Sequence, residues 1–440
     1  MRIAVIGAGI SGNLVARLLA RGNDLHLYEA ASYAGGHTNT VEFELDGQTY
    51  AADTGFMVFN RRTYPRFCRM LELLGIGVQP SDMSFSVRCD RSGWEYQGSS
   101  INGLFAQRHN LARFRFWAML CDIARFNREA TCIVRGGRSV DDATSVGDFL
   151  NQNRFGQPFV ERYLLPMVAA IWSTRPDRVL EFPLVFLLGF FHNHGLLQLR
   201  DRPRWLTIPG GARRYVDALL QPISHRLRLS TTVARVTRTS GSVHVQTQDG
   251  TVESFEHVVF ATHADQTLRL LGDADARERR ILGAFDYQQN HAVLHTDSSV
   301  LPRRRRAWAS WNYRVCADSV ACVTYDLRRL QRLSTPVPVL LSLNDDGRID
   351  QSKVLRTFQY SHPSFRAESL AAQRQHVAIS GRHRVHFCGA YWGYGFHEDG
   401  VRSALNVANY FGRNLDELRD LRPCRVVSTK ATSRISAMAP

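Results

Sequence analysis

The chain has 440 residues, 44% of them hydrophobic, so it is long enough for two domains, or one interrupted domain, around a large core. Its net charge of +15 suits anionic lipid headgroups or nucleic acid, but no basic helix with interleaved aromatic residues supports nucleic acid. The eight cysteines form no CxxC pair, which argues against a zinc site or a redox dithiol, and we predict no metal site.

The first elements are an apolar strand at residues 3–6, a glycine-rich turn and a helix. Gly7 permits a tight bend, Gly9 lets the backbone approach a phosphate, and Gly12 lets the helix pack against the strand. The free N–H groups at the helix N-terminus attract an anion. A second strand ends at Glu29, whose carboxylate can accept hydrogen bonds from ribose hydroxyls. This pattern predicts a dinucleotide site, and Glu29 disfavours NADP.

A diglycine, Gly35-Gly36, comes next, and residues 41–51 predict a hairpin that turns at an Asp-Gly pair. The segment Asp-Thr-Gly-Phe-Met follows at residues 53–57. In these features the chain resembles the superfamily of flavin amine oxidases and phytoene desaturases. The resemblance implies that the diglycine lies along the diphosphate of FAD and that segment 53–57 lies beside the flavin.

Three later segments fit the same superfamily. A Pro-Gly-Gly sequence within 205–211 precedes a helix, strand-like runs lie between residues 228 and 262, and residues 385–404 read as a strand, a glycine and aromatic loop and a helix start. The resemblance implies that the backbone of Val233 contacts adenine and that the last helix aims its N-terminus at the flavin pyrimidine, where its dipole stabilises negative charge. The residues expected to contact FAD are Gly7, Ala8, Gly9, Ser11, Gly12, Glu29, Ala30, Gly35, Gly36, His37, Thr38, Thr54, Gly55, Phe56, Met57, Val233, Ala261, Gly389, Gly400 and Val401.

Four short motifs carry a closer resemblance. They are Gly-His-Thr-Asn-Thr at 36–40, Phe-Met-Val-Phe-Asn at 56–60, Asn-His-Gly-Leu at 193–196 and Gly-Phe-His-Glu-Asp-Gly at 395–400. They are similar to motifs of bacterial flavoproteins related to the N-terminal domain of plant cyclopropane fatty acid synthases. This resemblance implies FAD as cofactor and an unsaturated or methyl-branched lipid acyl chain as substrate.

The resemblance and the element order together predict an α/β fold. A Rossmann-like, three-layer FAD-binding domain is expected at residues 1–85, 205–275 and 380–415. An α+β substrate domain, as in amine oxidases, is expected at residues 86–204 and 276–379. Residues 416–440 form a basic segment rich in Ser, Thr and Ala, which predicts a disordered tail.

Flavin oxidation of a C–H bond needs the donor carbon over the ring, and a base is optional. Relatives that oxidise amines often place a lysine near the flavin, but Lys353 and Lys430, the only lysines, lie outside the stretch that would supply it. The remaining candidates for catalysis are His194, His291, His397 and Glu398. The histidine at 291 falls roughly where that lysine would come. A structural role is the alternative for each histidine, and helix capping is the alternative for Glu398.

The predicted activity is desaturation or oxidation of a lipid acyl chain by hydride transfer to FAD. The alternatives are oxidation of an amine and a FAD-binding accessory role beside a lipid methyltransferase of the cyclopropane synthase type. We expect no signal peptide, no bilayer span and no nucleic-acid partner, hence a cytoplasmic protein. Peripheral contact with the inner membrane stays open. The apolar run 184–191 is read as a core helix, with the wall of an acyl tunnel or a membrane-dipping lid as the alternative. Arg303–Arg306 are read as a solvated loop or a phospholipid-facing patch.

Overall fold

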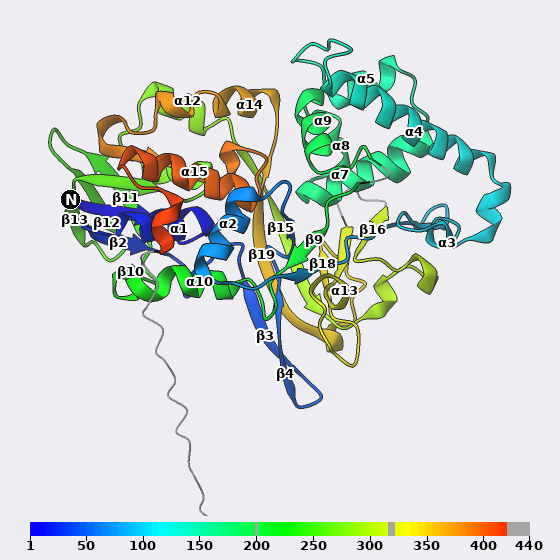
Figure 1. The fold of residues 1–440 in the computed structure, drawn as a ribbon, viewed down its shortest axis with the longest axis horizontal. Helices are drawn as coiled ribbons and strands as arrows, with labels where there is room; N and C mark the ends of the chain where they lie inside the picture. Colours follow the sequence, from blue (N-terminus) through cyan, green and yellow to red (C-terminus); the bar gives the residue numbers. More distant parts are fainter. Residues whose placement is uncertain (199–200, 316–321, 420–440) are drawn as a thin grey trace, which may run out of the picture.

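The computed structural model describes residues 1–198, 201–315 and 322–419. A five-stranded parallel sheet lies at one end of the molecule (Figure 1). Its order is β10 (Leu227–Arg228), β2 (Asp24–Tyr28), β1 (Arg2–Ile6), β14 (His257–Phe260) and β20 (Val385–Phe387). The neighbours β1 and β2 are parallel and are connected through α1 (Ile10–Leu19), so the predicted strand, turn, helix and strand form a βαβ unit.

Strand β1 is buried on both faces, and its alternate residues enter two different cores. Ile3 and Val5 share a core with α1, α2 (Pro65–Leu74), α10 (Arg213–Leu220) and α15 (His397–Tyr410). Ala4 and Ile6 share a core with the antiparallel sheet of β11 (Val233–Arg238), β12 (Val243–Thr247) and β13 (Val252–Phe255). Helices, parallel sheet and antiparallel sheet make three layers, which confirms the predicted α/β class.

A third core lies between a seven-stranded sheet and a group of helices. The sheet order is β19 (Val354–Ser364), β15 (Asp286–His295), β18 (Leu340–Leu343), β17 (Cys322–Asp326), β16 (Trp311–Val315), β7 (Phe85–Cys89) and β8 (Trp94–Gln97). The helices are α4 (Phe114–Val134), α5 (Val146–Gln152), α6 (Gln157–Phe159), α7 (Leu165–Trp172), α8 (Pro176–Val179) and α9 (Leu184–Asn193). The apolar run 184–191 lies in α9 and is largely buried, as expected of a core helix.

Smaller elements connect these cores. The predicted hairpin is present as β3 (Thr40–Leu45) and β4 (Gln48–Asp53). Strand β9 (Trp205–Thr207) pairs with both β5 (Phe59–Asn60) and β6 (Gln79–Pro80). Helices α12 (Ala276–Leu282) and α14 (Ala367–Gln373) contribute Ile281 and Ala372 to the core that contains the antiparallel sheet.

The structure describes the first residues of the predicted tail. Of the predicted tail 416–440, residues 416–419 complete the turn η10 (Leu415–Arg419), and Leu418 is buried against the helices of the first core. Residues 420–440 lie outside the described residues. Among the helices of the described chain, none combines the length and the apolar character needed to cross a bilayer.

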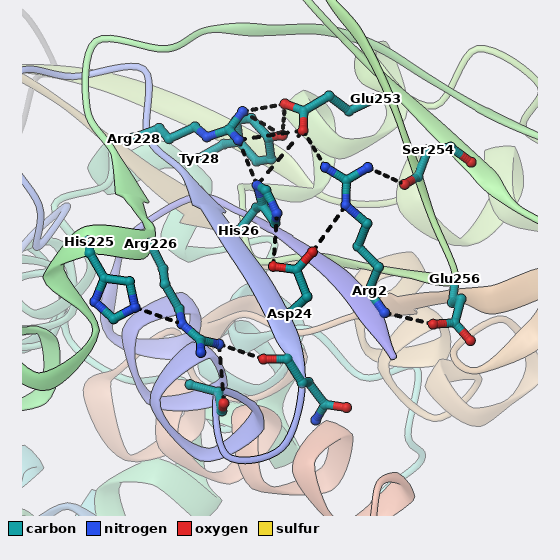
Figure 2. Close-up of polar contacts among 12 residues, drawn as sticks. Arg2, Asp24, His26, Tyr28, His225, Arg226, Arg228, Glu253, Ser254 and Glu256 are labelled. Atoms are coloured by element: carbon teal, nitrogen blue, oxygen red, sulfur yellow. Dashed lines mark hydrogen bonds and ion pairs between the residues drawn. The ribbon is translucent and has the colours of Figure 1, made fainter.

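A polar network fixes the carboxyl end of β2 (Figure 2). The Tyr28 hydroxyl donates a hydrogen bond to Oε1 of Glu253 at 2.9 Å, and Nη2 of Arg2 donates to Oε2 at 2.6 Å. Arg228 of β10 also donates to Glu253, and this bond lowers the pKa of the Glu253 carboxyl to about 2. Because Glu29 directly follows Tyr28, the network holds the strand end that presents Glu29.

Candidate active site

A cavity of about 720 Å³ lies beyond the carboxyl ends of β1, β2 and β14 and continues to the seven-stranded sheet. One part is lined by the turn after β1, by Glu29, by the diglycine and by Val233. The other part is lined by side chains of α7, α9 and strands β16 to β18. This is the edge where α/β sheets bind ligands, and the volume is in the usual range of ligand pockets.

Three glycines shape the turn after β1, each in a different way. Gly7 has a φ of +99°, and a Cβ there would lie 3.0 Å from the carbonyl oxygen of Ala261. A Cβ at Gly12 would lie 1.8 Å from the carbonyl oxygen of Gly7, so α1 packs directly on the turn. A Cβ at Gly9 would meet nothing within 4 Å, and Gly9 lines the cavity. The turn thus leaves open space beside the N-terminus of α1, as phosphate binding requires.

Glu29 lies at the same end of the cavity. Its Oε2 accepts a hydrogen bond from the N–H of Ala8 at 2.7 Å, and its Oε1 accepts one from the N–H of Ala31 at 2.9 Å. The carboxylate therefore stabilises the turn and, because each oxygen carries two lone pairs, keeps acceptor capacity for hydroxyl groups in the cavity. Ala30 and Val233 line the cavity beside it.

The diglycine forms the next part of the wall. A Cβ at Gly36 would lie 3.3 Å from Cα of Gly9, so the two backbone segments nearly touch. His37 lines the cavity here, and its Nε2 is buried without a hydrogen-bond partner among the described residues. Buried polar atoms normally have partners, so this nitrogen is available to a polar ligand such as a diphosphate.

The segment 54–57 and the start of α15 contact each other, and both line the cavity. A Cβ at Gly55 would lie 2.1 Å from the carbonyl oxygen of His37, so only glycine fits this position. The ring of Phe56 stacks on His397, with 3.6 Å between ring centroids. Nε2 of His397 lies 2.9 Å from the hydroxyl oxygen of Thr38. Burial lowers the pKa of His397 to about 3, so its imidazole is neutral at pH 7.

Fifteen of the residues expected to contact FAD line this cavity, including Ser11, Thr54, Met57 and Gly389. The other five lie behind the lining: Ala8, Gly12, Thr38, Gly400 and Val401. Two of them have clear structural roles. The carbonyl of Gly400 accepts a hydrogen bond from the Ser11 hydroxyl at 3.0 Å, and Val401 is fully buried in the core that contains α1 and α15.

The four candidates for catalysis separate into two pairs. His194 and His397 line the cavity, and burial lowers the pKa of His194 to about 4. His291 is not brought to the cavity, because β15 turns Asn290 inward and leaves His291 exposed. Glu398 is not brought there either. Its carboxylate accepts hydrogen bonds from backbone N–H groups at the start of α2, at 2.9 Å from Phe67, and so caps that helix.

Two further histidines line the cavity that the sequence patterns did not single out. The ring centroid of His37 lies 5.2 Å from that of His362 on β19 and 5.9 Å from that of His263 after β14. Nδ1 of His362 accepts a hydrogen bond from the side-chain amide of Asn290 at 2.8 Å, and burial lowers its pKa to about 4. The sequence offered a reason to place His263 in the cavity, because this residue follows the carboxyl end of a predicted parallel strand. It offered none for His362.

The part of the cavity next to the seven-stranded sheet is apolar. Its wall contains Met83, Ile171, Phe190, Leu196, Trp311, Leu341 and Leu343. The two charged residues in the described lining, Glu29 and Arg269, belong to the dinucleotide end, since α11 (Ala264–Leu270) packs against β11. Lys353 does not line the cavity and instead pairs with Asp297. The cavity is thus polar at one end and apolar at the other.

A parallel sheet covered by helices on one face and by an antiparallel sheet on the other, with this turn and this carboxylate, is the architecture of a dinucleotide-binding fold. Residues 15–287 match the family model described as flavin containing amine oxidoreductase, and the chain belongs to this family. The search of curated proteins gave no match.

Solved structures show the same fold. The chain is similar to a fatty acid isomerase from P. acnes that produces CLA, with 15% identity over 93% of this chain and 98% of that one and a TM-score of 0.67. It is also similar to cyclohexylamine oxidase from Brevibacterium oxydans, with 16% identity over 94% of this chain and 99% of the oxidase, and a TM-score of 0.66. A putrescine oxidase solved with putrescine shares 13% identity with this chain, over 93% of this chain and 99% of the oxidase, with a TM-score of 0.62.

Proposed function

We propose that this protein is a FAD-dependent oxidoreductase that desaturates or oxidises a lipid acyl chain. The observation that carries the substrate class is the apolar part of the wall next to the seven-stranded sheet, which includes Met83, Phe190 and Leu343 and carries no charged side chain among its described residues. An acyl chain is recognised by burial of its methylene groups, each worth about 0.8 kcal/mol. The similar fatty acid isomerase acts on a fatty acid by its name, which agrees with this choice.

The residues of the other end fit FAD rather than a smaller flavin. Glu29 keeps acceptor capacity for ribose hydroxyls, Gly9 leaves backbone surface open to a diphosphate, and His37 offers an unpartnered nitrogen. When bound, FAD supplies the acceptor for a hydride. The protein would then position the acyl carbon through the apolar wall and exclude water from it.

The neutral histidines belong to the same proposal. Burial keeps His397 uncharged, and its Nε2 is held by the hydroxyls of Thr38 and Tyr215, at 2.9 and 3.1 Å. A ring so held keeps its orientation, so it would position Phe56 rather than remove a proton from the substrate. His194 donates from Nδ1 to the carbonyl of Phe190 at 3.0 Å, so its neutral ring keeps Nε2 as an acceptor.

The test uses the purified yellow protein under anaerobic conditions. Flavin bleaching by a phospholipid or fatty acid extract, and not by a panel of amines, is the expected result. Met83→Glu should slow bleaching without changing FAD content, because it places a carboxylate in the apolar wall, whereas Met83→Leu should behave as wild type. A colourless protein that cannot be reconstituted overturns the FAD assignment.

Oxidation of an amine is the second candidate, favoured by the fold shared with cyclohexylamine oxidase and putrescine oxidase. It would be supported by bleaching with amines alone. Bleaching by neither class, together with tight binding of a lipid methyltransferase, would support the accessory role instead.

A further inference from the structure

Four large apolar side chains are exposed within a short stretch of chain at one end of the molecule. Phe114 is 84% exposed, Ile101 79%, Leu111 52% and Trp117 45%. They belong to α3 (Ile101–Leu104), the turn η1 (Arg108–Ala112) and the first turn of α4. Figure 1 shows α3 at the extremity far from the parallel sheet. Single exposed apolar residues are normal on a protein surface, but a cluster of this kind indicates an interaction site.

The stretch is firmly built beneath these side chains. The hydroxyl of Ser100 caps α3 by accepting a hydrogen bond from the N–H of Gly103 at 3.0 Å. Phe105 and Phe116 are buried and pack together, with 5.5 Å between ring centroids. Nε1 of Trp117 donates to the carbonyl of Leu111 at 2.9 Å. The exposed side chains are therefore presented by a packed scaffold.

Seven arginines accompany the apolar side chains. Arg108, Arg113 and Arg115 come from the same stretch, and Arg303–Arg306 come from the segment around η5 (Arg305–Ala307), which packs against α3. All seven are exposed, and residues 98–117 and 301–308 contain no aspartate or glutamate. The pKa of His109 is lowered, first by burial and then by the positive charges of Arg113 and Arg304. One arginine from each segment therefore acts on the same side chain.

Glu95 explains why the four consecutive arginines face outward. Its carboxylate is 3% exposed and accepts hydrogen bonds from the backbone N–H groups of Arg303 at 2.8 Å and Arg304 at 3.1 Å. The backbone is thus anchored inside. Nη1 of Arg304 also pairs with Oε2 of Glu95 at 3.8 Å, while the side chains of all four arginines stay exposed. We call the four apolar side chains and the seven arginines together the tip patch.

We propose that the tip patch docks this protein on an anionic membrane surface. Apolar side chains that protrude beside arginines suit a lipid interface, where the apolar groups enter the acyl boundary and the guanidinium groups meet phosphates. A second copy of the chain would bring seven like charges against seven, which opposes self-association. Nucleic acid would use the arginines but would leave Ile101 and Leu111 without a stacking role.

The experiment is flotation of the full protein with vesicles of phosphatidylcholine containing phosphatidylglycerol, compared with pure phosphatidylcholine. Binding is expected to the first alone and should weaken steeply between 50 and 500 mM salt. Phe114→Ser should weaken binding by about tenfold. The triple variant R303Q/R305Q/R306Q should weaken it by about fivefold or more for each arginine. Because these side chains are exposed, both variants should melt at the wild-type temperature.

Matched controls exist elsewhere on the chain. Val377→Ser removes an apolar side chain that is 82% exposed, and R277Q/R279Q removes two exposed arginines of α12, at the opposite end of Figure 1. Both should bind vesicles as wild type does, and Phe114→Leu should retain binding. Equal binding to neutral vesicles, or full binding by the tip-patch variants, overturns the proposal.

Two other partners are outcomes of the same test. If the tip-patch variants lose binding to a fluorescent oligonucleotide while the protein ignores anionic vesicles, the surface serves nucleic acid. If wild type sediments as a dimer that Phe114→Ser dissociates, without vesicle binding, it is a self-association face. Either result overturns membrane docking. Vesicle binding does not depend on FAD or on acyl oxidation, so the proposed function can fail while this inference stands.

Discussion

Alanine at Gly9 and at Gly12 should separate ligand binding from folding within a single turn. Gly9 has a φ of −76° and a ψ of −173°, which alanine adopts without strain, and a Cβ there meets nothing within 4 Å. Gly9→Ala should therefore leave the apoprotein folded and raise its unfolding free energy by about 0.4–1 kcal/mol, because the unfolded chain has less entropy to lose. The added methyl group would nevertheless occupy the wall where we expect the diphosphate.

Gly9→Ala should lower the affinity for FAD, whereas Gly12→Ala should lower the stability of the fold. In Gly9→Ala the FAD affinity should fall by about 1.5–3 kcal/mol, roughly 10- to 150-fold, through loss of one hydrogen bond to a charged group. In Gly12→Ala the Cβ would lie 1.8 Å from the carbonyl oxygen of Gly7. Backbone cannot rotate away as a side chain does, so the unfolding free energy should fall by about 3 kcal/mol or more.

The assays are urea unfolding of the deflavinated protein, followed by circular dichroism, and titration of FAD by quenching of its fluorescence. Gly241→Ala is the control, because Gly241 is exposed and a Cβ there also meets nothing within 4 Å. Wild-type FAD affinity in Gly9→Ala would refute the placement of the diphosphate. Wild-type stability in Gly12→Ala would refute the packing of α1 on the turn.

Three further predictions concern buried polar groups. Glu29→Gln should weaken FAD binding by about 1–3 kcal/mol in the same titration, and an unchanged affinity would mean that the carboxylate serves the turn alone. Asp53 accepts hydrogen bonds from the N–H of Ala212 at 2.9 and 3.0 Å, so Asp53→Ala should cost about 1–3 kcal/mol in urea unfolding; an unchanged midpoint would contradict this. Burial lowers the pKa of His362 to about 4 and of His397 to about 3, so below pH 6.5 the unfolded chain takes up protons that the folded apoprotein does not. Its stability should fall between pH 6.5 and 4, by about 2 kcal/mol for each histidine at pH 5, and equal stability at pH 7.5 and 5 would refute their neutral burial.

The dinucleotide half of the fold could be predicted because its signals are local. Gly7, Gly12 and Glu29 fall within one βαβ unit, and the physical reason for each is contained in a few neighbouring residues. The hairpin β3–β4 is equally local, since an Asp-Gly pair sets its turn. In both cases the sequence neighbours that create the signal are also the spatial neighbours.

The histidines of the cavity show where that reasoning stops. His362 reaches the cavity only because β15 and β19 pair with Gln288 opposite His362, a register set by residues more than 70 positions apart. The same strand sends His291 outward, although its position in the sequence suggested a catalytic role. Glu398 followed a cavity residue in sequence, yet its partners are the amides of α2. A one-residue step along a strand reverses the face of a side chain, and along a helix it turns the side chain by about 100°, so tertiary pairing decides which residues reach the cavity.

The distribution of charge along the cavity bears on the choice between acyl chain and amine. An ammonium ion would need a compensating carboxylate or an aromatic cage near the reacting carbon, because an unpaired buried charge is costly. Glu29 is bound to the turn at the dinucleotide end, and burial keeps His194, His362 and His397 neutral at pH 7. The cavity wall beyond Phe56 therefore offers apolar surface and uncharged nitrogens in its described residues, an environment that stabilises a hydrocarbon. An ammonium ion would find no free carboxylate in this described wall and would depend on aromatic rings such as Trp311 and Tyr325.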